Sequence, residues 1–403
     1  MTKKNFVPHW FEFINTSQVE KYKIFEEKMN VKYFSNVSLS PNLRIAIFRD
    51  GLFLPPVTGM AYHVLNLARY LNYNNLQAIV FRCFRGWENP TYYEKQDFDT
   101  LCIHPNYFYN DIELLLENIK KYNIDVAIFD DPEVIVLQGS IIKNNLGVKI
   151  VYDVPNIDAL LSKQLGKDTT YTNKQLQILN DAFKYIDLCW AKSEADKLEL
   201  INMGVNKEII SVNSIGVDTK KIPFKRRSVI PREVKGVFLG NLYYKPNIQA
   251  LSYLQNLADE CMRNGFPLDI YAIGDGNFTY LKKKFPLINF IGIVLELGVA
   301  LNNYDIAFCP IVIGSGASLK ILDYLAAGIP IITTKVGVRG LSEDVSKVVL
   351  LTDERELFTQ VKYLVNNPKL YSELSLRGRQ FVEEKHDWEI VIKEYIKTLD
   401  KKD

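Results

Sequence analysis

The feature that most constrains the fold is the stretch 306–334, which predicts a strand, a glycine-rich turn, a helix and a second strand. The apolar run 306–312 is typical of a buried strand, and Gly314 and Gly316 follow where the backbone must turn tightly. The next residues place apolar side chains on one helical face: Leu319, Leu322, Leu325 and Ala326. Gly328 then ends the helix. Because such a unit points unpaired N–H groups and a positive helix end at one place, it favours an anion site, most often for phosphate.

Two polar side chains of this helix support a site for a phosphate and a sugar. Lys320 falls in the first turn, within reach of a phosphate held by the glycine turn. Asp323 falls one turn later, where a carboxylate can accept hydrogen bonds from sugar or ribose hydroxyls. The alternative is an ordinary tight turn with both side chains solvated. A short glycine motif is a weak signal by itself, so the rest of the chain must decide.

Strand-like runs alternate with helix-like segments almost throughout, which favours α/β layers around parallel sheets. With 403 residues, 47% of them hydrophobic, the chain is long enough for two domains with separate cores. The strands predicted in the first half are 43–48, 77–81, 125–130, 148–153, 188–191 and 209–212. Those predicted in the second half are 236–239, 268–273, 289–291, 306–309, 329–333 and 348–351.

The domain boundary is expected at 219–232, where two prolines and six basic residues with little periodicity indicate an exposed linker. Its charge fits solvation, or alternatively a basic patch facing anionic lipid headgroups. We expect an N-terminal extension (1–40), an N-terminal domain (41–220), a linker (221–232), a C-terminal domain (233–380) and a last helix (381–403). His386 is expected to be an exposed residue where that helix starts.

Charge and composition exclude several classes of protein. A net charge of +2 gives no argument for nucleic acid. The five cysteines have neither paired nor metal-ligand spacing, which fits reduced thiols in a cytoplasmic protein. No apolar run reaches the ~18 residues of a membrane span, and no signal-peptide core is present. The aromatic residues near the N-terminus (Phe6, Trp10, Phe11 and Phe13) are expected to pack on the N-terminal domain, with a contact to the inner face of the membrane or to a partner as the alternative.

The stretch around Lys320 resembles the donor-binding motif of the retaining glycosyltransferases of family 4, the glycosyl transferases of group 1. These enzymes have the GT-B fold, in which two Rossmann-like domains face each other across a cleft. Their usual motif has two glutamates eight positions apart; here Ser315 stands at the first and Asp323 at the second. A branch of the family carries a Gly-Ser-Gly turn and a lysine in this helix, as this chain does at Gly314, Ser315, Gly316 and Lys320.

Three further segments follow the order of the same family, and the resemblance extends over residues 43–400. Thr58-Gly59, before the helical pattern 60–71, resembles the loop whose backbone approaches donor phosphate and acceptor. The segment 236–247 resembles the strand and loop that open the C-terminal domain, with Asn241 where many members have arginine. The segment 290–293 resembles the one whose backbone meets the nucleotide base, which leaves no side-chain code to separate uridine, guanosine and adenosine.

The resemblance implies that a sugar moves from a nucleotide diphosphate sugar, UDP-sugars included, to an acceptor hydroxyl with retention of configuration. The acceptor would be a glycan, a lipid-linked molecule or a protein, as in polysaccharide assembly, and would bind the N-terminal domain. The last helix would cross back onto that domain. No cofactor besides the donor is implied, and no metal. The implied catalytic residues are Gly59, Lys320 and Asp323. The implied donor-binding residues are Gly240, Asn241, Lys245, Ile291, Ile293, Gly314, Ser315, Gly316, Ala317, Ser318, Lys320 and Asp323.

Two alternatives stay open from the residues. A nucleotide-sugar epimerase has the same fold but needs acids and histidines that converge on the sugar. A degenerate transferase acting as a binding or partner subunit fits the serine at position 315 and the asparagine at position 241, where the family motif has glutamate and arginine.

Overall fold

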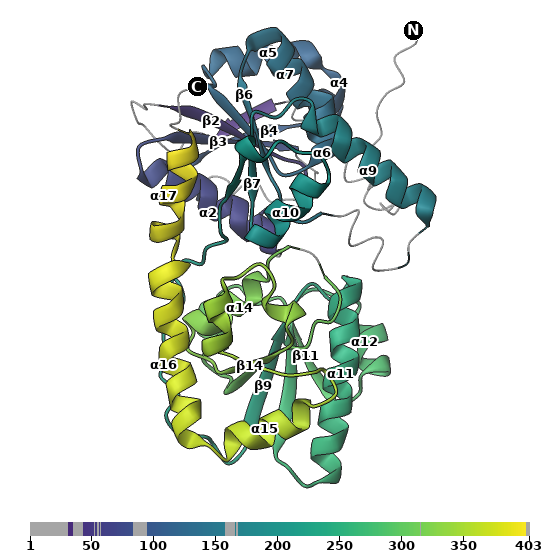
Figure 1. The fold of residues 1–403 in the computed structure, drawn as a ribbon, viewed down its shortest axis with the longest axis vertical. Helices are drawn as coiled ribbons and strands as arrows, with labels where there is room; N and C mark the ends of the chain where they lie inside the picture. The colour runs from purple at the N-terminus through teal and green to yellow at the C-terminus, as the bar shows by residue number, and fades with distance from the viewer. Residues whose placement is uncertain are drawn as a thin grey trace.

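The computed structural model describes residues 31–34, 43–51, 53–54, 56, 58–83, 95–157, 166, 168–314 and 316–399. They form two α/β domains, one above the other, with the C-terminal helices running along one side of both (Figure 1). Ser315 and the N-terminal aromatic residues of the predicted packing or membrane contact lie outside these ranges.

The N-terminal domain is built on an eight-stranded sheet with the order β1-β4-β3-β2-β5-β6-β7-β8. All neighbouring strands are parallel except β1 and β4. The strands are β1 (Val31–Phe34), β2 (Arg44–Arg49), β3 (Gln77–Cys83), β4 (Asp99–Ile103), β5 (Val126–Phe129), β6 (Lys149–Asp153), β7 (Leu188–Ala191) and β8 (Ile210–Val212). Apolar runs predicted six of these; β1, inside the predicted extension, and β4 were not predicted.

The C-terminal domain has an all-parallel sheet with the order β11-β10-β9-β12-β13-β14. Its strands are β9 (Val234–Leu239), β10 (Leu268–Ile273), β11 (Ile288–Gly292), β12 (Ile306–Cys309), β13 (Ile331–Thr333) and β14 (Leu350–Leu351). Each corresponds to a run predicted from the sequence. The expected architecture of two Rossmann-like domains is thereby confirmed.

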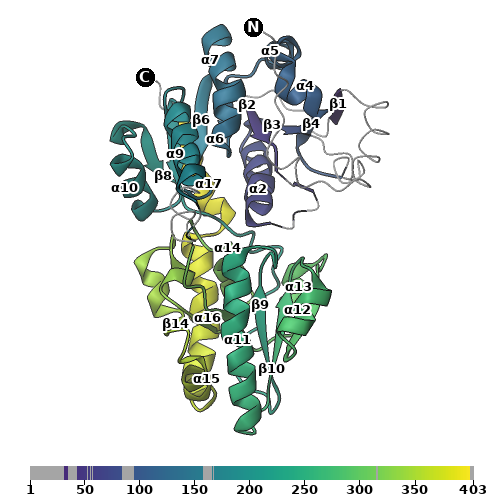
Figure 2. The same ribbon diagram turned by 90° about the vertical axis from the view of Figure 1, so that its right-hand side faces the viewer.

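Helices cover both faces of each sheet (Figure 2). Side chains of β2 alternate between the two faces, because successive residues of a strand point in opposite directions: Ile45 and Ile47 join one core, Ala46 and Phe48 the other. The N-terminal helices are α2 (Gly59–Tyr73), α4 (Pro105–Asn110), α5 (Ile112–Lys121), α6 (Pro132–Val134), α7 (Ser140–Leu146), α9 (Thr169–Phe183) and α10 (Glu194–Asn202). The C-terminal ones are α11 (Lys245–Arg263), α12 (Phe278–Lys284), α13 (Leu297–Leu301), α14 (Leu319–Ala326), α15 (Leu357–Val365), α16 (Pro368–Lys385) and α17 (Trp388–Leu399).

The last two helices connect the domains. Helix α16 packs on the C-terminal domain, and α17 continues upward to pack against α2 (Figure 1). Trp388, Ile392 and Tyr395 are buried in the same core as the α2 residues Val64 and Leu67. Helix α17 therefore forms part of the N-terminal core.

Two sequence-based expectations of exposure were wrong. His386 is only 2% exposed, because the link between α16 and α17 pairs with the crossing segment at Val217, and its Nδ1 lies 3.1 Å from the carbonyl oxygen of Ile215. Arg227, within the predicted linker, is 3% exposed. Its guanidinium donates to the carbonyl oxygens of Lys225, Leu301, Tyr304 and Ala327, so this basic residue fastens the linker to the C-terminal domain.

Candidate functional site

A cavity of about 850 Å³ lies between the two domains. It is lined by the start of α2, by the loops after β9 and β11, by residues before and within α14, and by the crossing segment 215–222. Several of these segments follow the carboxyl ends of parallel strands, where open α/β sheets bind ligands. The cavity therefore occupies the position expected for a substrate.

The amino ends of two helices, one from each domain, meet in the cavity wall. Thr58 caps α2, its hydroxyl accepting from the Ala61 N–H at 3.2 Å. Ser318, at the corresponding position of α14, makes no side-chain capping bond. The first N–H groups of α14 thus lack a side-chain cap beside the cavity, where the positive end of the helix dipole favours an anion.

The Lys320 side chain adds a positive charge at this place. Its ammonium donates to Asn247 Oδ1 at 2.8 Å and lies 4.3 Å from the centroid of the Phe238 ring. Burial lowers the pKa of Lys320. Within the part of the chain that the structure describes, no carboxylate lies within ion-pair distance of it. The ammonium is therefore held by neutral groups and can interact with an anionic ligand.

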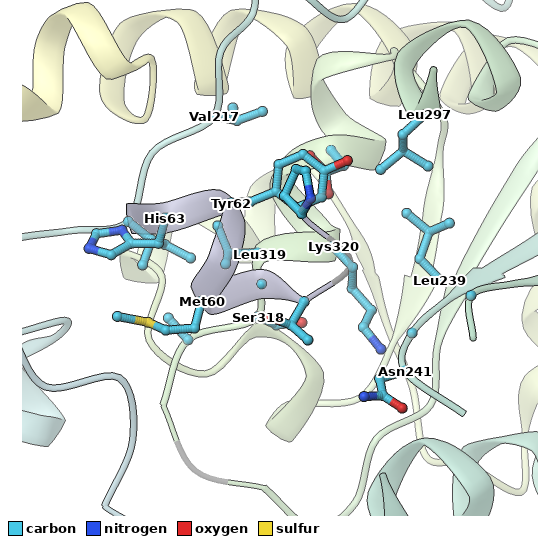
Figure 3. Close-up of a pocket in the computed structure, with 18 of the residues that line it drawn as sticks. Met60, Tyr62, His63, Val217, Leu239, Asn241, Leu297, Ser318, Leu319 and Lys320 are labelled. Carbon is cyan, nitrogen blue, oxygen red and sulfur yellow. The ribbon is translucent and has the colours of Figure 1, made fainter. Parts of the chain in front are cut away.

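Asp323 and Tyr62 approach each other from opposite domains. Burial raises the pKa of Asp323 to about 7. Burial, and then the charge of Asp323, raise the pKa of Tyr62 to about 12. Figure 3 shows the Tyr62 side chain on the side of α2 that faces Lys320, whereas the His63 side chain points away from Lys320. The carboxyl group thus changes its charge near neutral pH beside a tyrosine that stays protonated.

His63 belongs to a buried polar cluster in the wall of the cavity, which His63 and Lys192 both line. Its Nε2 lies 2.7 Å from Asp153 Oδ2, and Lys192 donates to the other oxygen of the same carboxylate. Lys192 also donates to the Tyr395 hydroxyl at 3.0 Å. Burial alone would raise the pKa of Asp153, but the charges of Lys192 and His63 lower it to about 2. The cluster fastens α17 to the N-terminal sheet, which fits a structural role for His63.

Most of the donor-site residues inferred from the sequence line the cavity: Gly59, Gly240, Asn241, Ile293, Gly314, Gly316, Ala317, Ser318, Lys320 and Asp323. Lys245 is exposed at the start of α11, and Ile291 is half exposed on β11; neither lines the cavity. The serine at position 315 is outside the described residues. Gly316 has φ +70° and lies so close to the N-terminal domain that a Cβ would be 2.5 Å from the carbonyl oxygen of Pro155.

Three residues of the site were missed from the sequence. Tyr62 was included in the helical pattern 60–71, and Asn247 only as the last residue of the segment that resembles the strand and loop opening the C-terminal domain. Arg339 lies beside the site: it donates to the Gly314 carbonyl at 3.2 Å, and its Nη2 is 3.6 Å from Asp196 Oδ1 of the N-terminal domain. No local pattern marks these residues, because domain packing brings them to the cavity.

The described residues contain neither a candidate metal site nor a candidate membrane-spanning helix. No group of three or more His, Cys, Asp and Glu side chains among them is arranged to hold a metal ion. None of the helices within those ranges is long and apolar enough to cross a membrane.

Comparisons with known proteins show a family match for one segment and the fold of both domains. Residues 233–367 match the family model described as glycosyl transferases group 1. No curated protein sequence matches the chain. Sucrose-phosphate synthase from Thermosynechococcus elongatus is similar in structure, with a TM-score of 0.72 and 14% identity over 89% of this chain and 98% of that one. Anabaena HepE, solved with UDP and glucose, has a TM-score of 0.70 and 13% identity over 89% of this chain and 99% of its own. The glycosyltransferase WaaG, involved in lipopolysaccharide biosynthesis, has a TM-score of 0.65 and 12% identity over 89% of this chain and 100% of its own.

The two domains, their cavity and these neighbours define the GT-B fold. Within the C-terminal domain, residues 233–367 are similar to the glycosyl transferases of group 1, the family that the motif around Lys320 led us to expect.

Proposed function

We propose that this protein is a glycosyltransferase that moves a sugar from a nucleotide diphosphate sugar to an acceptor hydroxyl, with retention of configuration. The observation that carries the proposal is the uncapped start of α14 with the Lys320 ammonium beside it, inside the inter-domain cavity. Both lie in the segment that matches the family model. UDP-sugars are the first donors to test, because HepE was solved with UDP-glucose.

In this reaction the bond between the anomeric carbon and a phosphate oxygen breaks, a bond to the acceptor oxygen forms, and the proton of the acceptor hydroxyl passes to the departing diphosphate. The departing diphosphate gains negative charge. Lys320 and the first N–H groups of α14 would stabilise that charge, because preorganised donors in a site shielded from water act strongly on developing charge. Asp323 would accept hydrogen bonds from ribose hydroxyls. Gly59 would let the start of α2 approach the reacting centre.

The acceptor would enter from the N-terminal domain, and its class stays a proposal: a glycan, a lipid-linked molecule or a protein. WaaG acts in lipopolysaccharide biosynthesis, and TarM was solved with a GlcNAc-glycerol. Both examples favour a role in cell-surface glycan assembly. A peripheral contact with the membrane would suit such acceptors.

The experiment is to incubate the protein with UDP-, GDP- and ADP-sugars together with glycan or glycerol-based acceptors that carry free hydroxyls, and to measure release of the nucleoside diphosphate. The anomeric configuration of the product is then read by NMR. Release that depends on Lys320, with retention, is expected. Conversion of the donor sugar without release would identify an epimerase instead.

A second candidate is a partner subunit without activity of its own. Asn241 stands at the position of the family arginine, and Lys245 does not line the cavity. The diphosphate region therefore holds less positive charge than the family usually provides. Nucleotide binding without turnover in the purified protein, and turnover on adding a second protein, would favour this candidate.

A further inference from the structure

The side-chain amide of Asn247 joins the two segments proposed to hold the diphosphate. Its Oδ1 accepts from the Lys320 ammonium at 2.8 Å, and its Nδ2 donates to the Asn241 carbonyl oxygen at 2.8 Å. An ammonium only donates and a carbonyl oxygen only accepts, so these partners fix which end of the amide faces which segment. Asn247 is 6% exposed, and the geometry is therefore protected from competing water.

The local backbone is shaped to admit this amide. Asn247 lies in the first turn of α11, and its own N–H donates to the Tyr244 carbonyl at 2.9 Å. The side chain then reaches back over the loop that follows β9. A Cβ at Gly240 would be 2.6 Å from Asn247 Nδ2, so a larger residue at that position would displace the amide. The glycine of the loop and the asparagine of the helix thus form one arrangement.

A neutral acceptor is suited to holding a lysine that must bind an anion. A long lysine side chain loses considerable rotamer freedom when it is fixed, and an acceptor that fixes it beforehand removes that cost from ligand binding. The Phe238 ring supports the ammonium on another side. A carboxylate at position 247 would also fix the lysine, but it would cancel the positive charge offered to a phosphate. An amide fixes the ammonium and leaves its charge uncompensated.

We propose that Asn247 is a positioning residue that sets the Lys320 ammonium, together with the 240–241 loop, against the diphosphate of the donor. The inference rests on the proposed function, since it assigns a role within the same donor site. This role adds Asn247 to the donor-site residues, although the sequence placed it only at the end of the segment 236–247. It also explains how the Lys320 ammonium is held in place in a chain that has Asn241 where many members of the family have arginine.

The test is a double-mutant cycle measured by calorimetry with UDP and with uridine, which lacks the diphosphate. If GDP or ADP binds better than UDP, that nucleotide and its nucleoside are used. The variants are Asn247→Ala, Lys320→Met and the double mutant. Asn247→Ala is expected to weaken UDP binding about fivefold to tenfold, the size of effect of one ordinary hydrogen bond, because the Lys320 ammonium stays present but is no longer held in place; uridine binding should be unchanged. With Lys320→Met present, the same change is expected to alter UDP affinity less than about twofold.

Two further variants keep the test decisive. Asn247→Asp is nearly isosteric and covers the case in which the alanine variant fails to fold; it is expected to weaken UDP and to spare uridine. Asn72→Ala is the matched control, because Asn72 is a buried asparagine that bonds to the Ala68 and Ala78 carbonyls and does not line the cavity. That control is expected to lower stability without changing UDP affinity.

Equal losses from Asn247→Ala with and without Lys320 would overturn the inference and leave the proposed function standing. An unchanged UDP affinity in Asn247→Ala would do the same. Failure of the folded wild-type protein to bind any nucleoside diphosphate would overturn both.

Discussion

Gly59 of the N-terminal domain lies directly against Leu319 of the C-terminal domain: a Cβ on Gly59 would be 2.8 Å from Leu319 Cδ1. The amino ends of α2 and α14 are therefore in contact across the cavity. Figure 3 shows Leu319 and Ser318 close to the first residues of α2. The space at Gly59 thus sets how closely the two domains approach.

Substituting Gly59 should separate the helix ends in proportion to side-chain size. Gly59→Ala requires Leu319 to change rotamer, which costs about 1 kcal/mol, and should reduce kcat/KM only slightly. Gly59→Val should reduce it about 100-fold, since a displacement near 1 Å is enough for such a loss. Steady-state kinetics of the two variants would measure kcat/KM, and thermal unfolding would confirm that the two are equally stable. Full activity of Gly59→Val would contradict the role of the contact.

Lys320→Met should weaken UDP binding by about 10- to 100-fold, because a hydrogen bond to a charged group contributes about 1.5–3 kcal/mol to the binding free energy. Uridine should bind as before. The matched control is Lys245→Met, which removes an exposed lysine outside the cavity. Calorimetry on both variants measures the difference. If Lys245→Met had the larger effect, the cation would have to be reassigned.

Asp323→Asn should alter how stability depends on pH. The pKa of this carboxyl rises from 3.8 to about 7 on folding because it is buried. Between those values the unfolded chain releases the proton and the folded protein keeps it, so the wild type loses stability as pH rises through this window. The asparagine variant lacks that loss. Its Tm relative to wild type should therefore increase from pH 4 to pH 7 and then level off; a difference independent of pH would refute the assignment.

Arg339→Met should lower kcat/KM about fivefold, because this residue connects the donor-loop carbonyl of Gly314 with Asp196 of the other domain. Asp196→Asn should have a smaller effect when Arg339 is already replaced. The control is Arg355→Met, whose side chain is 89% exposed and pairs with its neighbour Glu354. Strict additivity of the Arg339 and Asp196 effects would show that their contact does not contribute.

Lys192→Met should destabilise the protein by about 3–5 kcal/mol in urea unfolding, because the buried Asp153 carboxylate loses its lysine partner and keeps only the contact with His63 among those described above. Tyr395→Phe should cost about 1–3 kcal/mol, because its hydroxyl accepts from Lys192 and donates to the Asn213 carbonyl oxygen. The exposed pair of Lys184 and Asp181 provides the control, and Lys184→Met should leave the unfolding curve unchanged. A Lys192 variant as stable as wild type would exclude the cluster as the anchor of α17.

The sequence predicted the parts of the fold that depend on local pattern. Continuous apolar runs predicted all six strands of the C-terminal sheet, because strands buried on both faces carry few polar residues. Strand β4 was missed because Asp99 and Thr100 interrupt its apolar pattern, although both are buried. In the sheet, the Asp99 carboxylate accepts from the Gln77 side chain at 2.9 Å, a partner far away in the sequence.

In the site, too, residues placed by local pattern could be predicted, and residues that depend on distant partners could not. Lys320 and Asp323 could be predicted because a strand, a glycine turn and a helix place them without reference to other segments. Asn247 and Arg339 could not, since each acts through a residue at least 25 positions away along the chain. Arg227 and His386 were expected at the surface because charge and polarity are typical of exposed positions. Their carbonyl partners come from other segments, and that pairing makes burial acceptable.

The central claim is that a donor diphosphate binds between the amino ends of α2 and α14. The most direct measurement is a crystal structure of the protein with UDP at saturating concentration. We expect the diphosphate oxygens within hydrogen-bond distance of Lys320 Nζ and of the first N–H groups of α14, with Asp323 facing the ribose. UDP bound elsewhere, or a cavity without UDP in a well-ordered crystal, would contradict the claim.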